Sequence, residues 1–188
     1  MSFKYLIILI FCLIISFTSN LRAQALLGIL PQGDPTIAFE AFIKNGFTDA
    51  YPDYPETKGK VLKGYVLGQK AIIKIFSYNN EIESFELSYP DFGSGESMNW
   101  YENKRRFFGL RENLTHKYQS PTSETWNDNG LQINTLRRYE LKEGTIFHSY
   151  WNLNDKYDIQ LIANPGIYLT YSNKTVVKKR KDKESSPF

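Results

Sequence analysis

The stretch from Asn99 to Pro121, NWYENKRRFFGLRENLTHKYQSP, is the longest segment of the chain with helical periodicity. Five large side chains recur in it at 3.6-residue spacing and form one apolar stripe: Trp100, Phe107, Leu110, Leu114 and Tyr118. Asn99 is the predicted N-cap and Glu102 completes a capping box, while Pro121 ends the helix near Tyr118. Short β-like runs flank the stretch on both sides, so it predicts a helix laid on an antiparallel sheet.

Two residues inside this helix, Gly109 and Arg111, do not belong to the apolar stripe. Gly109 should cost about 1 kcal/mol relative to alanine, but burial of the stripe at about 1.5–3 kcal/mol per side chain outweighs that cost. Arg111 lies at the edge of the stripe. The favoured interpretation is an arginine whose stem covers apolar surface while its head reaches water; the alternative is a partner-binding or buried, paired arginine.

The N-terminus predicts export. Lys4 precedes an uninterrupted apolar run, Tyr5 to Phe17, and small and polar residues then lead to Ala23-Gln24-Ala25. This is the pattern of a secretory signal peptide, cleaved after Ala23 or Ala25, and the run is shorter than the roughly 20 residues that a membrane span needs. Cleavage removes the only cysteine, Cys12, so the mature chain is expected to carry no disulfide.

Charge and length divide the rest of the chain. The expected organisation is a signal peptide at 1–23, a single α+β domain at 24–175 and a basic flexible tail at 176–188. The formal net charge of the whole chain is +3, but its excess of positive charge lies in the signal region and the tail, which leaves the body slightly negative. A nucleic-acid-binding body would show a basic face, so we expect no nucleic-acid partner and, after cleavage, no membrane span.

The remaining pattern is one further helix and many short strands. Asp34 and Pro35 predict a helix start, and Gly46 followed by Phe47 predicts its end. Alternating runs predict strands around Val61–Val66, Ala71–Phe76, Glu83–Tyr89, Leu131–Leu141, Thr145–Leu153, Tyr157–Ile162 and Ile167–Tyr171. Asn129-Gly130 predicts a type I′ hairpin. The expected fold class is therefore α+β, an antiparallel sheet of about seven or eight strands with two helices on one face, whose order suggests two α-β-meander halves.

No residue pattern reaches a catalytic or metal-binding constellation. His116 and His148 are the only histidines, and neither has a second histidine or a cysteine at metal-ligand spacing. We therefore assign no catalytic residue, no metal and no cofactor. The sequence does not exclude a catalytic pair of carboxylates that are distant in the chain and meet only in the folded structure.

The aromatic content is the only feature of the sequence that suggests a binding surface. The chain has 13 Tyr, 13 Phe and 3 Trp, and an open aromatic sheet face suits recognition of protein or carbohydrate; ordinary strand propensity is the competing explanation. The candidate binding residues are Tyr139, His148, Tyr150 and Tyr168 on the sheet, with Tyr51 and Tyr54 in the acidic, aromatic loop Thr48–Lys60.

The chain resembles a set of secreted α+β proteins of Bacteroidota for which no activity is established. The matching residues are Lys44, Gly46 and Phe47, then Trp100, Leu110, Leu114, Lys117, Tyr118 and Pro121, then Tyr171-Ser172-Asn173. Gln119 stands where the family has glycine. The resemblance implies the fold and export, and it carries over no site.

Three functions compete on this basis. The first is an exported, non-catalytic binding protein that uses the open sheet face and has an envelope or secreted protein as its partner. The second is a secreted hydrolase, which predicts a carboxylate within hydrogen-bond reach of His148 in a pocket. The third is a carrier of an apolar ligand, which predicts an enclosed cavity of about 300 Å³ or more.

Overall fold

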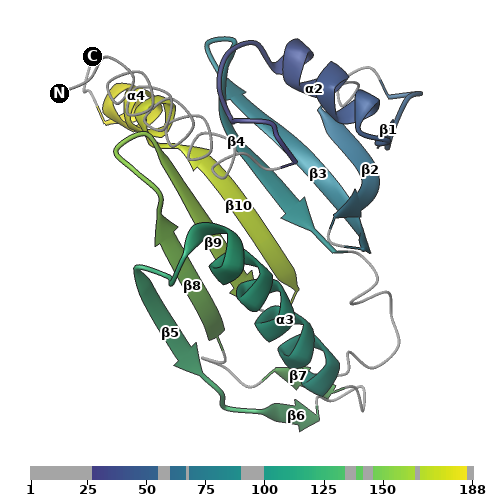
Figure 1. The fold of residues 1–188 in the computed structure, drawn as a ribbon, viewed down its shortest axis with the longest axis vertical. Coiled ribbons are helices and arrows are strands. Elements are labelled where there is room, and N and C mark those ends of the chain that lie inside the picture. Colours follow the sequence, from purple (N-terminus) through teal and green to yellow (C-terminus); the bar gives the residue numbers. More distant parts are fainter. Residues whose placement is uncertain are drawn as a thin grey trace, which may run out of the picture. The chain divides into compact units, whose positions relative to one another are not determined.

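An eight-stranded antiparallel sheet with the order β1-β2-β3-β4-β10-β9-β8-β5 organises the chain (Figure 1). The computed structural model describes residues 27–54, 60–66, 68–89, 100–133, 139–141, 146–163 and 166–185. The chain divides into the units Met1–Leu30 and Pro31–Phe188, and every helix and strand named here belongs to the second. The predicted α+β class is confirmed.

The sequence of elements reads as two similar halves. The first half is α2 (Pro35–Lys44), β1 (Thr48–Asp49), β2 (Val61–Val66), β3 (Gln69–Tyr78) and β4 (Glu81–Ser88). The second is α3 (Trp100–Tyr118), β5 (Ser123–Asn127), β8 (Ile146–Asn152), β9 (Tyr157–Ala163) and β10 (Ile167–Asn173). Each half is thus a helix followed by four strands of the sheet, and the last strands, β4 and β10, pair at its centre.

Local chemistry sets the ends of α2 as the sequence predicts. The Asp34 side chain accepts a hydrogen bond from the Thr36 amide at 2.7 Å, with Pro35 at the first helical position. At the other end Gly46 has φ +86°. The Phe47 amide donates to the Phe42 carbonyl at 3.1 Å, and the two rings meet edge to face at 5.6 Å. This is a Schellman stop.

The long helix α3 also ends where the sequence predicts. Its residues Phe107, Leu110 and Leu114 are buried; Asn99 and the side chains of Trp100 and Glu102 lie outside the described part of the chain. Gln119, just beyond the helix, has φ +70°. Glycine adopts this left-handed conformation at the end of a helix more easily than glutamine does.

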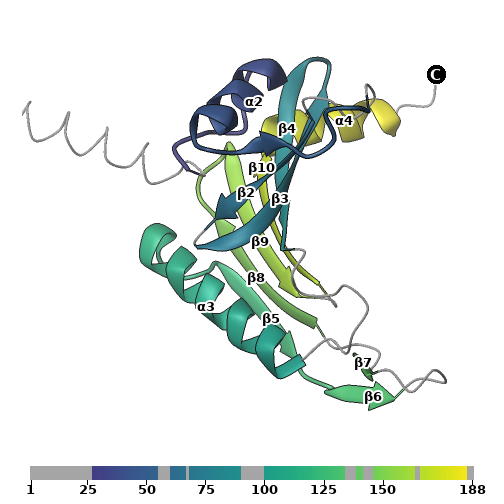
Figure 2. The same ribbon diagram turned by 90° about the vertical axis from the view of Figure 1, so that its right-hand side faces the viewer.

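Aromatic contacts fix the helices on the sheet. Phe42 of α2 meets Phe85 of β4 at a centroid distance of 5.1 Å, and Phe107 of α3 meets Phe147 of β8 at 5.6 Å. A third helix, α4 (Lys174–Glu184), contacts β4 and β10 (Figure 2). The predicted packing of helices on a single face stays a prediction.

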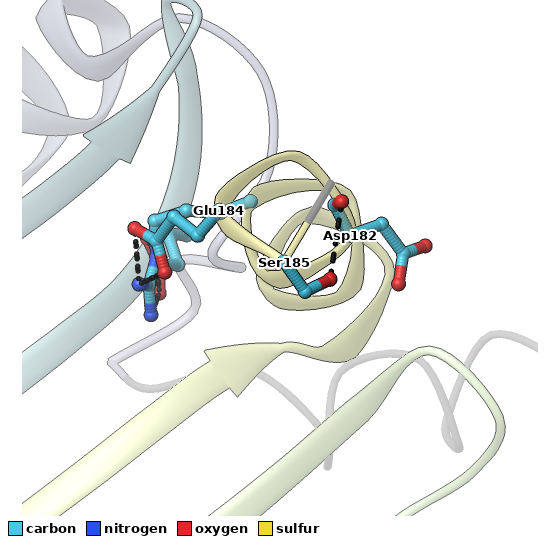
Figure 3. Close-up of polar contacts among 5 residues, drawn as sticks. Asp182, Glu184 and Ser185 are labelled. Atoms are coloured by element: carbon cyan, nitrogen blue, oxygen red, sulfur yellow. Dashed lines mark hydrogen bonds and ion pairs between the residues drawn. The ribbon is translucent and has the colours of Figure 1, made fainter. Parts of the chain in front are cut away.

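The third helix corrects the expected basic flexible tail at 176–188. Asn173 caps α4 through its side chain, which accepts from the Val176 amide at 3.4 Å, and Val176 is fully buried. Arg180 binds Glu83 of β4 and also Glu184 one turn along the helix, as Figure 3 shows for Glu184. At the C-terminal end the Ser185 hydroxyl donates to the Asp182 carbonyl at 3.2 Å (Figure 3).

Two strand predictions are wrong. The segment expected as one strand, Leu131–Leu141, contains β6 (Leu131–Ile133) and β7 (Tyr139–Leu141), which pair with each other in a separate sheet. Asn129-Gly130 does not form the type I′ hairpin, because β5 pairs with β8 instead of β6. A type I′ turn needs positive φ at both central residues; Gly130 has φ +77°, but Asn129 is not among the positive-φ residues.

Candidate functional site

Two adjacent rows of side chains across the sheet differ sharply in exposure. One cross-strand row is at most 1% exposed and consists of Ser149, Leu161, Leu169, Leu87, Ile73 and Leu62. The row displaced by one residue consists of His148, Ile162, Tyr168, Ser88, Ile72 and Lys63, and every one of its residues is half-exposed or exposed. Successive side chains of a strand point to opposite faces, so the first row belongs to a covered face and the second to an open face.

Three predicted site residues share this open face. His148 pairs with Ile162, and Ile162 pairs with Tyr168, so the histidine and Tyr168 lie two strands apart, about 10 Å by strand spacing. Tyr150 lies two residues beyond His148 on β8 and therefore on the same face. Tyr168 is 39% exposed. The sheet thus brings together residues that are 20 positions apart in the sequence; their role in binding stays a prediction.

The other predicted residues do not join them. Tyr51 and Tyr54 form an edge-to-face pair at 6.2 Å and are 45% and 58% exposed. They follow β1, six strands from β8 in the sheet order, a separation of about 29 Å at ordinary strand spacing. Tyr139 belongs to β7 of the separate two-stranded sheet, and its side chain lies outside the described part of the structure.

A polar cluster adjoins the open face and had no signal in the sequence. Asp158 of β9 is 8% exposed, and its Oδ2 accepts a hydrogen bond from the Tyr150 hydroxyl at 3.3 Å. Its Oδ1 is buried without a hydrogen-bond partner among the described residues. Burial raises the pKa of Asp158, against the opposing effects of hydrogen bonds from Ser172 and Tyr150 and of the Lys174 charge. Strand pairing alone assembles this cluster.

The hydrolase hypothesis predicted a carboxylate beside His148. The Nε2 of His148 is buried without a hydrogen-bond partner among the described residues. The carboxylate of Asp158, four residues along β9 from the Ile162 that pairs with His148, accepts from the Tyr150 hydroxyl. Nor do the described ranges contain any group of three or more His, Cys, Asp and Glu side chains that could hold a metal ion. The structure thus places His148 on the open face, and the hydrolase hypothesis stays a prediction.

A second polar network lies at the edge of the covered face. Arg111 of α3 donates to Glu124 of β5 through Nε at 2.6 Å and through Nη2 at 2.8 Å. The hydroxyl of Ser149, which is fully buried, donates to the same carboxylate at 2.7 Å. These bonds lower the pKa of Glu124, and that of Arg111 is raised in turn. Arg111 is therefore paired, as in the alternative interpretation, but its side chain is 25% exposed and not buried.

An exposed tryptophan completes this edge. Trp126 of β5 is 52% exposed. The Arg111 guanidinium lies 5.3 Å from its ring centroid, and Phe108 contacts it edge to face at 5.5 Å. Trp126 belongs to the five-residue strand β5, and nothing in the sequence of that strand indicated the contact with α3.

No helix among the described residues is long and apolar enough to cross a membrane. The chain matches no family model, no curated protein and no solved structure in the three comparisons. The resemblance to the secreted Bacteroidota proteins therefore stays a prediction.

Proposed function

We propose that the protein is an exported, non-catalytic binding protein whose ligand is another envelope or secreted protein. The signal-peptide pattern of residues 1–23 supports export. The open face supports binding, and the contrast between its exposed row and the neighbouring buried row is the observation that carries the proposal.

The composition of the open face favours a protein as the ligand. Its centre carries aromatic and aliphatic side chains, with Tyr168 and Ile162 paired on adjacent strands. Toward β3 the face turns charged, where Lys74 forms an ion pair with Glu86 at 3.8 Å. An apolar centre with a polar rim is the usual plan of a protein interface, whereas a small-molecule site is normally concave.

The preferred experiment measures binding of envelope proteins from the source organism to the purified, exported protein. Ile162→Asp and Tyr168→Ala change the centre of the open face. The matched control is Ile37→Ala on α2, because Ile37 is an apolar side chain that is 69% exposed. The proposal predicts a saturable partner that both open-face variants lose and the control keeps. A partner that binds all three variants equally would contradict it.

Export has its own test. The intact mass of the protein recovered outside the cytoplasm should correspond to a chain that starts at Gln24 or Leu26. Recovery of the full-length chain in the cytoplasm would contradict export without bearing on the open face.

A further inference from the structure

The outer edge of β5 offers a second interaction surface, separate from the open face. β5 is the last strand of the sheet and pairs only with β8 among the described residues. All five of its residues are exposed. An unpaired edge presents a row of backbone donors and acceptors that can template another strand.

The two edges of the sheet are not alike. The opposite edge strand, β1, is only two residues long, and a very short edge strand is one of the ways in which proteins prevent edge pairing. β5 extends over five residues, or about 17 Å. It contains neither proline nor lysine, the residues that commonly protect an edge.

The β5 edge is also held in a fixed conformation. Glu124 is bound by Arg111 and Ser149, and the Trp126 ring rests against Arg111 and Phe108. A strand and an aromatic side chain that are already ordered lose little conformational entropy when a ligand binds. The network thus orders both the β5 backbone and the Trp126 side chain before a ligand binds.

Charge and size determine the kind of occupant. Arg111 neutralises Glu124, and Lys104 neutralises Asp128 just beyond the strand, so the edge has no unbalanced charge to attract a charged ligand. A stable dimer needs about 1,200–2,000 Å² of total buried surface, more than a five-residue edge supplies. An extended peptide on a sheet edge instead gains affinity from main-chain hydrogen bonds and specificity from alternate side chains.

We propose that the β5 edge binds an extended, uncharged segment of another protein, which adds a ninth strand to the eight-stranded sheet. An aromatic or aliphatic side chain of that segment packs on Trp126.

The probe is a synthetic nine-residue peptide of alternating threonine and valine with phenylalanine at its centre. The controls are two N-methylated versions of the same peptide. One carries N-methyl groups on the odd-numbered residues and the other on the even-numbered residues, so each version blocks one edge of the peptide. Binding is measured by calorimetry on the purified protein, and amide hydrogen exchange of residues 123–127 locates it.

The proposal predicts saturable binding, slower exchange in β5, and loss of binding for one of the two N-methylated peptides. Trp126→Ala should weaken binding at least tenfold, whereas Ile37→Ala, on α2, should leave it unchanged. Exchange mapping needs no variant, so it shows whether the peptide binds at β5 even if Trp126→Ala fails to fold.

Three results would overturn the proposal: absence of saturable binding, binding without slower exchange in β5, or equal binding of both N-methylated peptides. Concentration-dependent dimerisation that protects β5 without any peptide would also overturn it, since the occupant would then be a second copy of this chain.

Discussion

Arg111 on α3 donates two hydrogen bonds, of 2.6 and 2.8 Å, to the carboxylate of Glu124 on the edge strand β5. The same carboxylate accepts the buried Ser149 hydroxyl. One side chain therefore ties the helix, the edge strand and β8 together. Glu124→Ala should lower the free energy of unfolding by about 1–3 kcal/mol, because it leaves a buried donor unsatisfied.

Urea unfolding of the variant provides the measurement. Glu112→Ala is the matched control: Glu112 faces His116 on the same helix at 3.9 Å, with both side chains at least 74% exposed. Such exposed pairs contribute little, so the control should change stability by less than about 0.5 kcal/mol. Equal effects of the two substitutions would show that the Glu124 network does not contribute to the free energy of unfolding.

The two polar clusters should respond to pH in opposite directions. Glu124 has a lowered pKa, so its stabilising contribution is present above the unfolded-state pKa and is lost as pH falls through the folded-state value. Asp158 has a raised pKa, so the ionised form destabilises the fold at neutral pH and this cost disappears as pH falls.

Asp158→Asn tests the expected pH dependence of the contribution of Asp158 to stability. The substitution removes the buried charge, so the variant should gain stability relative to the parent above the raised pKa of Asp158, and the gain should vanish near the ordinary value of 3.8. Chemical denaturation over a pH series measures the difference. A gain that does not depend on pH would mean that ionisation of Asp158 is not its cause.

Gly64 and Gly109 should respond to alanine with opposite signs. A Cβ on Gly64 of β2 would lie 2.5 Å from the Phe47 ring, whereas a Cβ on Gly109 of α3 meets nothing within 4 Å. Gly64→Ala should therefore cost about 1–3 kcal/mol through overpacking. Gly109→Ala should add about 1 kcal/mol through helix propensity.

Thermal unfolding of the two variants measures this pair, each serving as the control for the other. Stabilisation by Gly64→Ala would show that the Phe47 ring moves aside at no cost, and the close contact would then not explain the glycine.

Gln119→Gly should stabilise the protein. Gln119 follows α3 with φ +70°, a conformation that costs a non-glycine L-residue about 1–2 kcal/mol and glycine almost nothing. Its exposed side chain can be removed, while its carbonyl still accepts from Trp151 Nε1 at 3.0 Å. The expected gain is about 0.5–1 kcal/mol after glycine's larger unfolded-state entropy is considered; a loss of stability in equilibrium unfolding would contradict this account.

The features predicted from sequence are those that local chemistry determines. Asp34, Gly46 and Phe47 set the ends of α2. The alternation in β8 correctly separated buried Phe147 and Trp151 from half-exposed His148 and Tyr150.

Two of the missed features, α4 and the Asp158 cluster, depend on distant partners, and the third depends on a local side chain. α4 has little apolar surface of its own, and it is held partly by Glu83, which lies 97 residues before Arg180. At Asn129-Gly130 the Asp128 side chain accepts from the Gly130 amide at 3.2 Å, so a local side-chain turn replaces the expected hairpin. Asp158 joins Tyr150 and Ser172 only through strand pairing, and no single segment contains that information.

Site-specific photo-crosslinking in cells of the source organism tests the central claim, that the open face binds another protein, most directly. A benzophenone side chain replaces Tyr168 on the open face in one variant and Ile37 on α2 in the other, both exposed positions. The account predicts one discrete adduct from position 168, none from position 37, and loss of the adduct when Ile162→Asp is added. Equal adducts from both positions, or none from position 168, would contradict it.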